Sequence, residues 1–255
     1  MLLALKLILS PTLIGLVSIA SRRWGPSVGG WLVSLPLTSA PIILFLAIDQ
    51  GTAFASSAAQ NTMLGIISVA CFCMVYSWFS LRFGWLISML AGWGAFFALT
   101  LILDDISLPL SLSFLGVIAF LAIVLTIMPD NQSEGITVNQ PEWDTPLRML
   151  VATAFVLGLT GAAAILGPHL SGLLTPFPMF TTILAVFTHH FQGANFARRL
   201  LEGVVTGSFT FVAFFLIISL VVNRWGIAFA FSLAIIVAIM THSTSLFLMR
   251  HFHHS

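Results

Sequence analysis

Two short segments of this sequence place prolines and hydroxyl side chains together inside strongly apolar stretches. SLPLTSAP holds Pro36 and Pro41, and TPFPMFTT holds Pro176 and Pro178. A proline inside a helix removes a backbone donor and frees a carbonyl group one turn earlier. In lipid, that carbonyl must find a partner in protein, water or ligand. The chemistry predicted here is binding of a neutral ligand through hydroxyls and freed backbone groups. The candidate residues are Ser34, Pro36, Thr38, Ser39, Thr175, Pro176, Pro178, Thr181 and Thr182.

The alternative is a pair of proline kinks that neighbouring serines and threonines satisfy without any ligand. Gln50 and Gln192 follow the same two stretches, and each precedes a glycine that is expected to end the helix. We include both glutamines among the candidate binding residues, where they would line vestibules. Capping at the membrane interface would explain them equally well.

Other residue types give little sign of chemistry. The sequence contains no P-loop, HExxH or GxSxG motif and no paired intramembrane carboxylates, so we predict no enzyme, no catalytic residue and no cofactor. The C-terminal HFHH is expected to be an exposed tail, not a metal site. Glu202 and His242 are weak candidates for a proton-handling pair. Cys71 and Cys73, two residues apart, are expected to be packing residues.

The amino-acid composition indicates whether water or lipid surrounds this chain. Hydrophobic residues make up 59% of the 255 residues, charged residues only 7%, and the mean hydropathy is +1.09. So few charges cannot cover a water-facing surface, which indicates a polytopic membrane protein whose main partner is the lipid bilayer. No basic run suggests nucleic acid. We predict an all-α fold with about nine spans of roughly 20 residues each. They lie at 2–20, 28–48, 62–81, 85–103, 108–128, 149–166, 170–188, 200–222 and 225–249.

An internal repeat is the most informative feature of the chain. Shifting the sequence by 142 positions, from 25 to 167, places GPSVGGWLVSLP on GPHLSGLLTPFP. The match continues without a gap. Gln50 and Gly51 fall on Gln192 and Gly193, Gly65 on Gly207, Arg82 on Arg224, and Lys6 on Arg148.

Each unit has four expected spans, with one further span between them. An odd number of spans before the second unit makes it enter the membrane from the opposite side, which predicts an inverted repeat of the kind common in secondary transporters. The predicted organisation is a first four-helix repeat at 1–104, a linker span at 105–129, a cytoplasmic loop at 130–146, and a second repeat with a short tail at 147–255.

Charge placement predicts the orientation. With the N-terminus outside, seven arginines lie on the inside, against only Lys6 and Arg224 outside. The positive-inside rule therefore favours an external N-terminus and a cytoplasmic C-terminus. The inside arginines are Arg22, Arg23, Arg82, Arg148, Arg198, Arg199 and Arg250.

The repeated basic residues need a separate explanation, because inversion places one of each pair on each side. Lys6, Arg82, Arg148 and Arg224 are candidates for gates or for cationic mouths that attract an anion. Snorkelling at helix ends is the alternative.

The stretch FPMFTTILAVFTHHFQGANFARRLLEGVV, from Phe177, resembles the centre of the small GlpM-like bacterial inner-membrane proteins. The resemblance covers roughly 40 residues of each unit, and the first unit departs from it with Leu37-Thr38 after Pro36. It implies a double-length relative in the inner membrane and assigns no functional residue.

These observations favour a secondary transporter of a small solute or a lipid-linked anion, with its site between the second and seventh spans. The alternatives are a membrane scaffold or regulatory subunit without transport activity, and an intramembrane enzyme. The substrate, the coupling ion and the oligomeric state cannot be read from the sequence.

Overall fold

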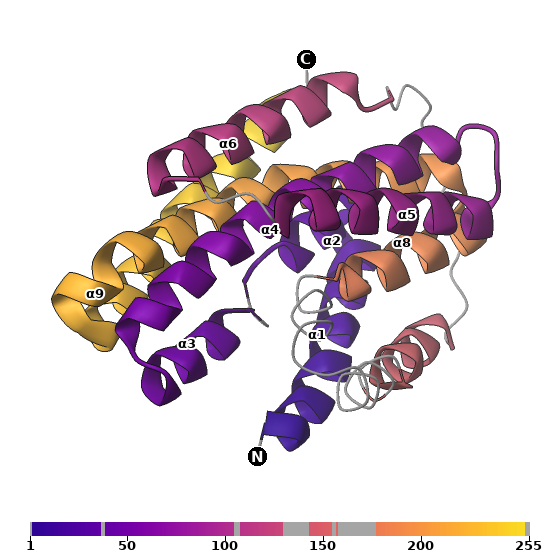
Figure 1. The fold of residues 1–255 in the computed structure, drawn as a ribbon. Coiled ribbons are helices and arrows are strands. Elements are labelled where there is room, and N and C mark those ends of the chain that lie inside the picture. The colour runs from indigo at the N-terminus through magenta and orange to yellow at the C-terminus, as the bar shows by residue number, and fades with distance from the viewer. Residues whose placement is uncertain are drawn as a thin grey trace.

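The computed structural model describes residues 2–36, 39–104, 108–129, 143–154, 157 and 177–252, and the side chains of all these except 2–10, 104 and 245–252. Every regular element in these residues is an α-helix (Figure 1). The helices are α1 (Leu2–Trp24), α2 (Pro26–Val33), α3 (Ser39–Asp49), α4 (Thr52–Phe79), α5 (Trp85–Asp104), α6 (Leu110–Ile127), a helix at 144–154, α8 (Met179–Gln192) and α9 (Ala194–Phe252).

Four of the described helices are long and apolar enough to cross a membrane: α4, α5, α6 and α9. The exposed side chains of α5 and α6 are mostly large and apolar, as at Ile102 (61% exposed) and Leu115 (60% exposed). Lipid is the solvent in which such surfaces are stable. The described part of the chain is therefore all-helical and has the properties of a membrane protein.

α9 is a hairpin of two helical legs. Gly226 interrupts it with φ 80° and ψ 172°, a conformation that only glycine adopts readily. The second leg folds back on the first, since Thr210 lies 3.1 Å from the Nδ1 atom of His242 and Phe214 packs edge-on against Phe231. Figure 1 shows the two legs meeting at one end of the molecule.

The first leg of α9 runs antiparallel to α4. Near the start of α4, the Ser56 hydroxyl donates to the Ser219 carbonyl over 2.8 Å, and the Ser219 hydroxyl donates back to the Ser56 carbonyl over 3.1 Å. Near the end of α4, the Tyr76 hydroxyl lies 3.2 Å from His189, just before α9 begins. The two helices thus form an antiparallel pair at the centre of the fold.

α2 lies unusually close to α9. A Cβ atom added at Gly30 would stand 1.8 Å from the Leu200 carbonyl oxygen, and one at Gly203 would stand 2.1 Å from that of Ser27. Small residues at a crossing let two backbones approach, which is the main packing device of membrane helices. Trp31 of α2 also stacks on His242, with ring centroids 3.3 Å apart.

α4 begins ten residues earlier than the span expected there, at Thr52 instead of Thr62. The additional turns carry the polar residues Ser56, Gln60 and Asn61. Gln60 donates to the Leu108 carbonyl over 2.7 Å and to the Ser113 hydroxyl over 3.1 Å. Partners inside the protein make the polar groups of Ser56 and Gln60 acceptable next to lipid.

Candidate functional site

The first proline segment forms a break between α2 and α3. α2 ends at Val33, and α3 begins at Ser39. The Ser34 hydroxyl donates to the Trp31 carbonyl over 2.7 Å, and the Ala40 amide donates to the Pro36 carbonyl over 2.8 Å. The break therefore uses a serine to satisfy one of the carbonyls that the end of α2 leaves free. Thr38 lies outside the described residues.

The second proline segment leads into α8. Pro178 caps α8, and its carbonyl accepts from the Thr182 amide over 2.8 Å. Thr181 and Thr182 are both buried, and the Thr182 hydroxyl accepts a bond from the indole of Trp93 over 3.2 Å. Thr175 and Pro176 lie outside the described residues, so the structure describes the second proline segment only from Phe177 onward.

A cavity of about 530 Å³ lies between these two segments. Ser34 and Ser39 line it from the first segment, and Pro178 and Thr181 line it from the second. The remaining walls come from α3, α4, the end of α5 and the first leg of α9. The volume falls within the range of small-molecule sites, roughly 300–1,000 Å³.

The cavity lining is neutral. None of the described residues that line it is ionisable, and its polar groups are hydroxyls and the Asn61 amide. Two of these hydroxyls stand out, because the Oγ of Ser68 and the Oγ1 of Thr100 are buried without a hydrogen-bond partner. A buried hydroxyl without a partner costs about 1–3 kcal/mol.

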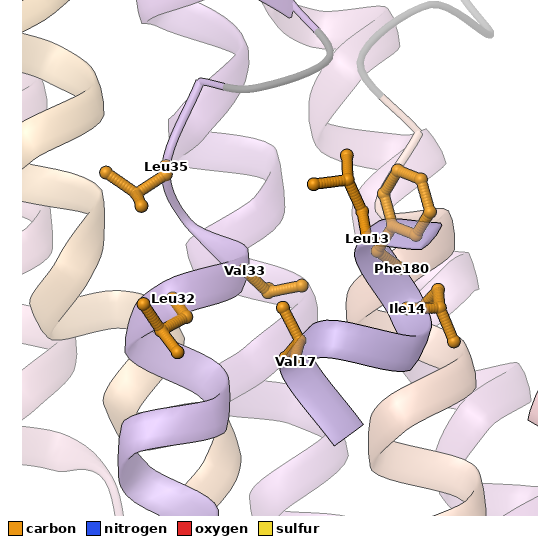
Figure 2. A pocket seen from close by; sticks show the side chains of 7 residues that line it. All are labelled: Leu13, Ile14, Val17, Leu32, Val33, Leu35 and Phe180. Atoms are coloured by element: carbon orange, nitrogen blue, oxygen red, sulfur yellow. The ribbon is translucent and has the colours of Figure 1, made fainter. Parts of the chain in front are cut away.

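A second, much smaller pocket of about 20 Å³ adjoins the first (Figure 2). Its walls are all apolar and come from α1, the end of α2 and α8. Val33, Leu35 and Phe180 line both spaces. The smaller pocket therefore adds no polar side chain to the site.

The two glutamines lie away from the cavity lining. Gln50 is exposed at the end of α3, and Gln192 is half-buried at the end of α8. Each precedes a glycine with nearly the same backbone conformation: Gly51 has φ 91° and ψ 166°, and Gly193 has φ 98° and ψ 170°. The expectation that these glycines end their helices agrees with the structure.

The repeated basic residues differ in their surroundings where the structure describes their side chains. Arg82 and Arg224 are exposed, and the Lys6 side chain is outside the described residues. Arg148 is only 1% exposed, and its Nε donates to both Asp144 oxygens, over 3.1 Å and 3.0 Å. Its charge is therefore neutralised inside the protein instead of standing open at a mouth.

Asp144 is the centre of a buried ion cluster that the sequence reasoning missed. It is fully buried, and Arg22 at the end of α1 donates to its Oδ2 over 3.0 Å. The guanidinium of Arg148 lies over the Phe187 ring of α8 at 5.3 Å. The only signal in the sequence was the four-residue spacing of Asp144 and Arg148, which is a favourable pair on one helix.

No protein-family model, curated protein or solved structure matches this chain. The resemblance to GlpM-like proteins therefore stays a prediction.

Proposed function

We propose that this chain is a secondary transporter of a small solute and that the cavity between the α2–α3 break and the start of α8 holds the solute. The observation that carries the proposal is the cavity itself, because a packed kink would leave no space there. Hydroxyls from both halves of the sequence line it, as expected of a site between two repeats. The neutral lining favours an uncharged solute over the lipid-linked anion.

We further propose nine spans arranged as an inverted repeat. α4 and the first leg of α9 begin at equivalent positions, Thr52 and Ala194, and an inverted repeat requires such helices to run antiparallel. The turns before them are alike, since the Ala55 amide donates to Gly51 over 3.2 Å and the Ala197 amide donates to Gly193 over 3.3 Å.

We also propose, from the arginine distribution, that the N-terminus lies outside and the C-terminus inside a bacterial inner membrane. Helix ends that this arrangement places on the same side meet in the structure, which is equally true of the opposite orientation. Arg22 and Asp144, assigned to the inner side, bond to each other. Trp85, at the start of α5, lies 6.2 Å from the ring of His190. At the opposite side, Gln60 bonds to Leu108.

Cysteine accessibility tests the proposal. Cysteines replace Ser39 and Asn61, which both line the cavity and are not fully buried, in a chain whose Cys71 and Cys73 are alanines. A transporter exposes its site to each side in turn, so a membrane-impermeant thiol reagent should label both positions in intact cells and in inverted vesicles.

Two positions serve as controls in the same chain. Ser77 is buried on α4 outside the cavity lining, and Leu115 is exposed on α6. Cysteines there should stay unlabelled by a reagent that cannot enter lipid or packed protein. If neither position 39 nor position 61 is labelled, a membrane scaffold without transport activity is the better explanation. Labelling from one side only would exclude alternating access.

A further inference from the structure

His242 is a buried histidine in α9, one of the four helices that are long and apolar enough to cross a membrane. It lies on the second leg and is 8% exposed. On the same buried face, the three preceding turns carry the alanines Ala230, Ala234 and Ala238. Ionisable side chains are costly within a membrane and mostly have a function there. Packing alone would need only another apolar residue, so we looked for a chemical role of His242.

Two contacts connect His242 to the wall of the cavity. Its ring stacks on the indole of Trp31, with centroids 3.3 Å apart and planes 11° apart. The Trp31 carbonyl in turn accepts a bond over 2.7 Å from the hydroxyl of Ser34, which lines the cavity. The Nδ1 atom of His242 lies 3.1 Å from the Thr210 hydroxyl, and Phe211, the next residue of the first leg, also lines the cavity. His242 therefore lies directly behind the cavity wall.

Protonation of His242 changes both contacts. A neutral imidazole has one donor and one acceptor nitrogen, whereas both nitrogens donate in the protonated ring, so the Thr210 hydroxyl must then accept. The indole face of Trp31 attracts the positive charge, but this attraction is weaker than the cost of taking a charge out of water. The protonated ring is therefore more stable where water reaches it.

Other titratable groups on the elements around His242 are further along the chain from its contacts. Glu202 is the one closest in sequence to Thr210 on the first leg, eight residues earlier and so about 12 Å away along the helix axis. Arg198 and Arg199 lie about one turn beyond Glu202. Neither α2 nor α6 carries an ionisable side chain. Those of α4 and α8, which also pack against α9, are Cys71, Cys73, Tyr76, His189 and His190.

The internal repeat indicates how water reaches His242. The shift of 142 positions places Thr100 on His242 and Ser68 on Thr210. Thr100 lines the cavity, so the second unit has an imidazole at the position equivalent to a cavity residue of the first. Alternating access moves one repeat against the other. In the opposite conformation we therefore expect position 242 to line the equivalent space of the second unit, whereas the described conformation buries it against Trp31.

We propose that His242 is a proton-binding site and that its protonation shifts the transporter from the described conformation to the opposite one. A ligand that binds one conformation better than the other shifts their populations by that difference in affinity, and here the ligand is the proton. The inference deepens the proposed function and rests on it, because it needs the two conformations of alternating access.

Hydrogen–deuterium exchange at the imidazole C2 position tests proton binding in the unsubstituted protein. Full-length protein in nanodiscs is incubated in heavy water at a series of pH values, and mass spectrometry follows the peptide that contains His242. This exchange needs contact with water and follows the titration of the ring. We expect a titration curve at His242, as at the exposed His190. Negligible exchange of His242 at every pH would show a permanently buried histidine and would overturn the inference.

Labelling of the Asn61→Cys chain tests the conformational effect. An impermeant thiol reagent is applied to right-side-out and to inverted membrane vesicles, with nigericin to equalise the pH across the membrane. The ratio of the two rates cancels the reactivity of the thiol itself. In the proposed orientation the described cavity opens outwards, because Phe54 and Leu103, near the outer ends of α4 and α5, line it. We expect the right-side-out to inverted ratio to fall about three- to ten-fold from about pH 8 to about pH 5, the range in which histidine titrates.

Two histidines give a matched pair of variants in this chain. His242→Gln keeps a polar side chain next to Thr210 but binds no proton in this range, so the ratio should become independent of pH. His190→Gln removes an exposed histidine at the end of α8 and should keep the full shift. Thermal unfolding of each variant verifies the fold.

Two further results would overturn the inference: a ratio that does not change with pH, and equal shifts in the two histidine variants. Both can occur while position 61 is labelled from the two sides, in which case the transport proposal stands and only the role of His242 is wrong. Labelling of position 61 from one side only would refute both proposals, because no second conformation would exist for the proton to favour.

Discussion

Gly207 of α9 lies against Ser34 of α2 so closely that a Cβ atom at position 207 would stand 1.9 Å from the Ser34 Oγ atom. Gly203 makes the same kind of contact one turn earlier, against Ser27. The two glycines therefore form a groove in α9 that holds α2 up to the residue where the chain breaks. The cavity wall at Ser34 and Ser208 depends on this contact.

We expect Gly203→Ala to destabilise the protein by about 1–3 kcal/mol, because the new methyl group meets backbone instead of a movable side chain. Thermal unfolding in detergent measures the effect. Gly94→Ala and Gly116→Ala, in α5 and α6, are the controls, since a Cβ atom there meets nothing within 4 Å. Equal melting temperatures for all three variants would contradict the close approach of α2 and α9.

We expect Asp144→Asn to destabilise the protein by about 3–5 kcal/mol, because it leaves the buried Arg148 without a counter-charge. Chemical unfolding in mixed micelles measures the loss. Asp49→Asn is the control: Asp49 is exposed at the end of α3, so its effect should stay within about 0.5 kcal/mol.

The double variant Asp144→Asn with Arg148→Met separates the ion pair from other effects. Removing both charges should restore part of the stability that Asp144→Asn loses, with a coupling of about 0.5–3 kcal/mol. Additive losses would show that the two side chains do not depend on each other.

We expect Gly51→Ala and Gly193→Ala to cost about 1–3 kcal/mol each, because both glycines adopt a backbone conformation that is nearly restricted to glycine. Steric contact plays no part, since a Cβ atom at either position meets nothing within 4 Å. The two losses, measured by unfolding, should be similar because the turns are alike. A large difference between them would speak against equivalent repeats.

We expect a reporter enzyme active only in the cytoplasm to be active when fused to the C-terminus and inactive when inserted after Asp104. The odd number of spans and the arginine distribution require this pattern. Expression of each fusion, followed by immunoblot, serves as the control. An external C-terminus would refute both the orientation and the count of nine spans.

The features predicted correctly from the sequence are those that follow from the physical effect of a single residue type. Pro36 removes a backbone donor, and the helix does end just before it. Gly51 and Gly193 were expected at helix ends and lie there. Low charge predicted membrane helices, and four of the described helices have the required length and hydropathy.

Prediction failed where the partner lies far away in the chain. Arg22 and Asp144 are 122 residues apart, and nothing in their local sequence indicates that they meet. Gly203 and Gly207 did carry a signal, since two glycines four residues apart are typical of close helix crossings. The spacing could not tell which helix they would face, because that depends on the tertiary arrangement.

The hairpin in α9 has a very short turn, so it presents little surface to other molecules on one side of the membrane. Its two legs are joined through the single non-helical residue Gly226. Proteases cut preferentially at exposed, poorly hydrogen-bonded loop tips. A digest of intact cells should therefore spare this connection, and an antibody raised against its peptide should fail to bind the folded protein.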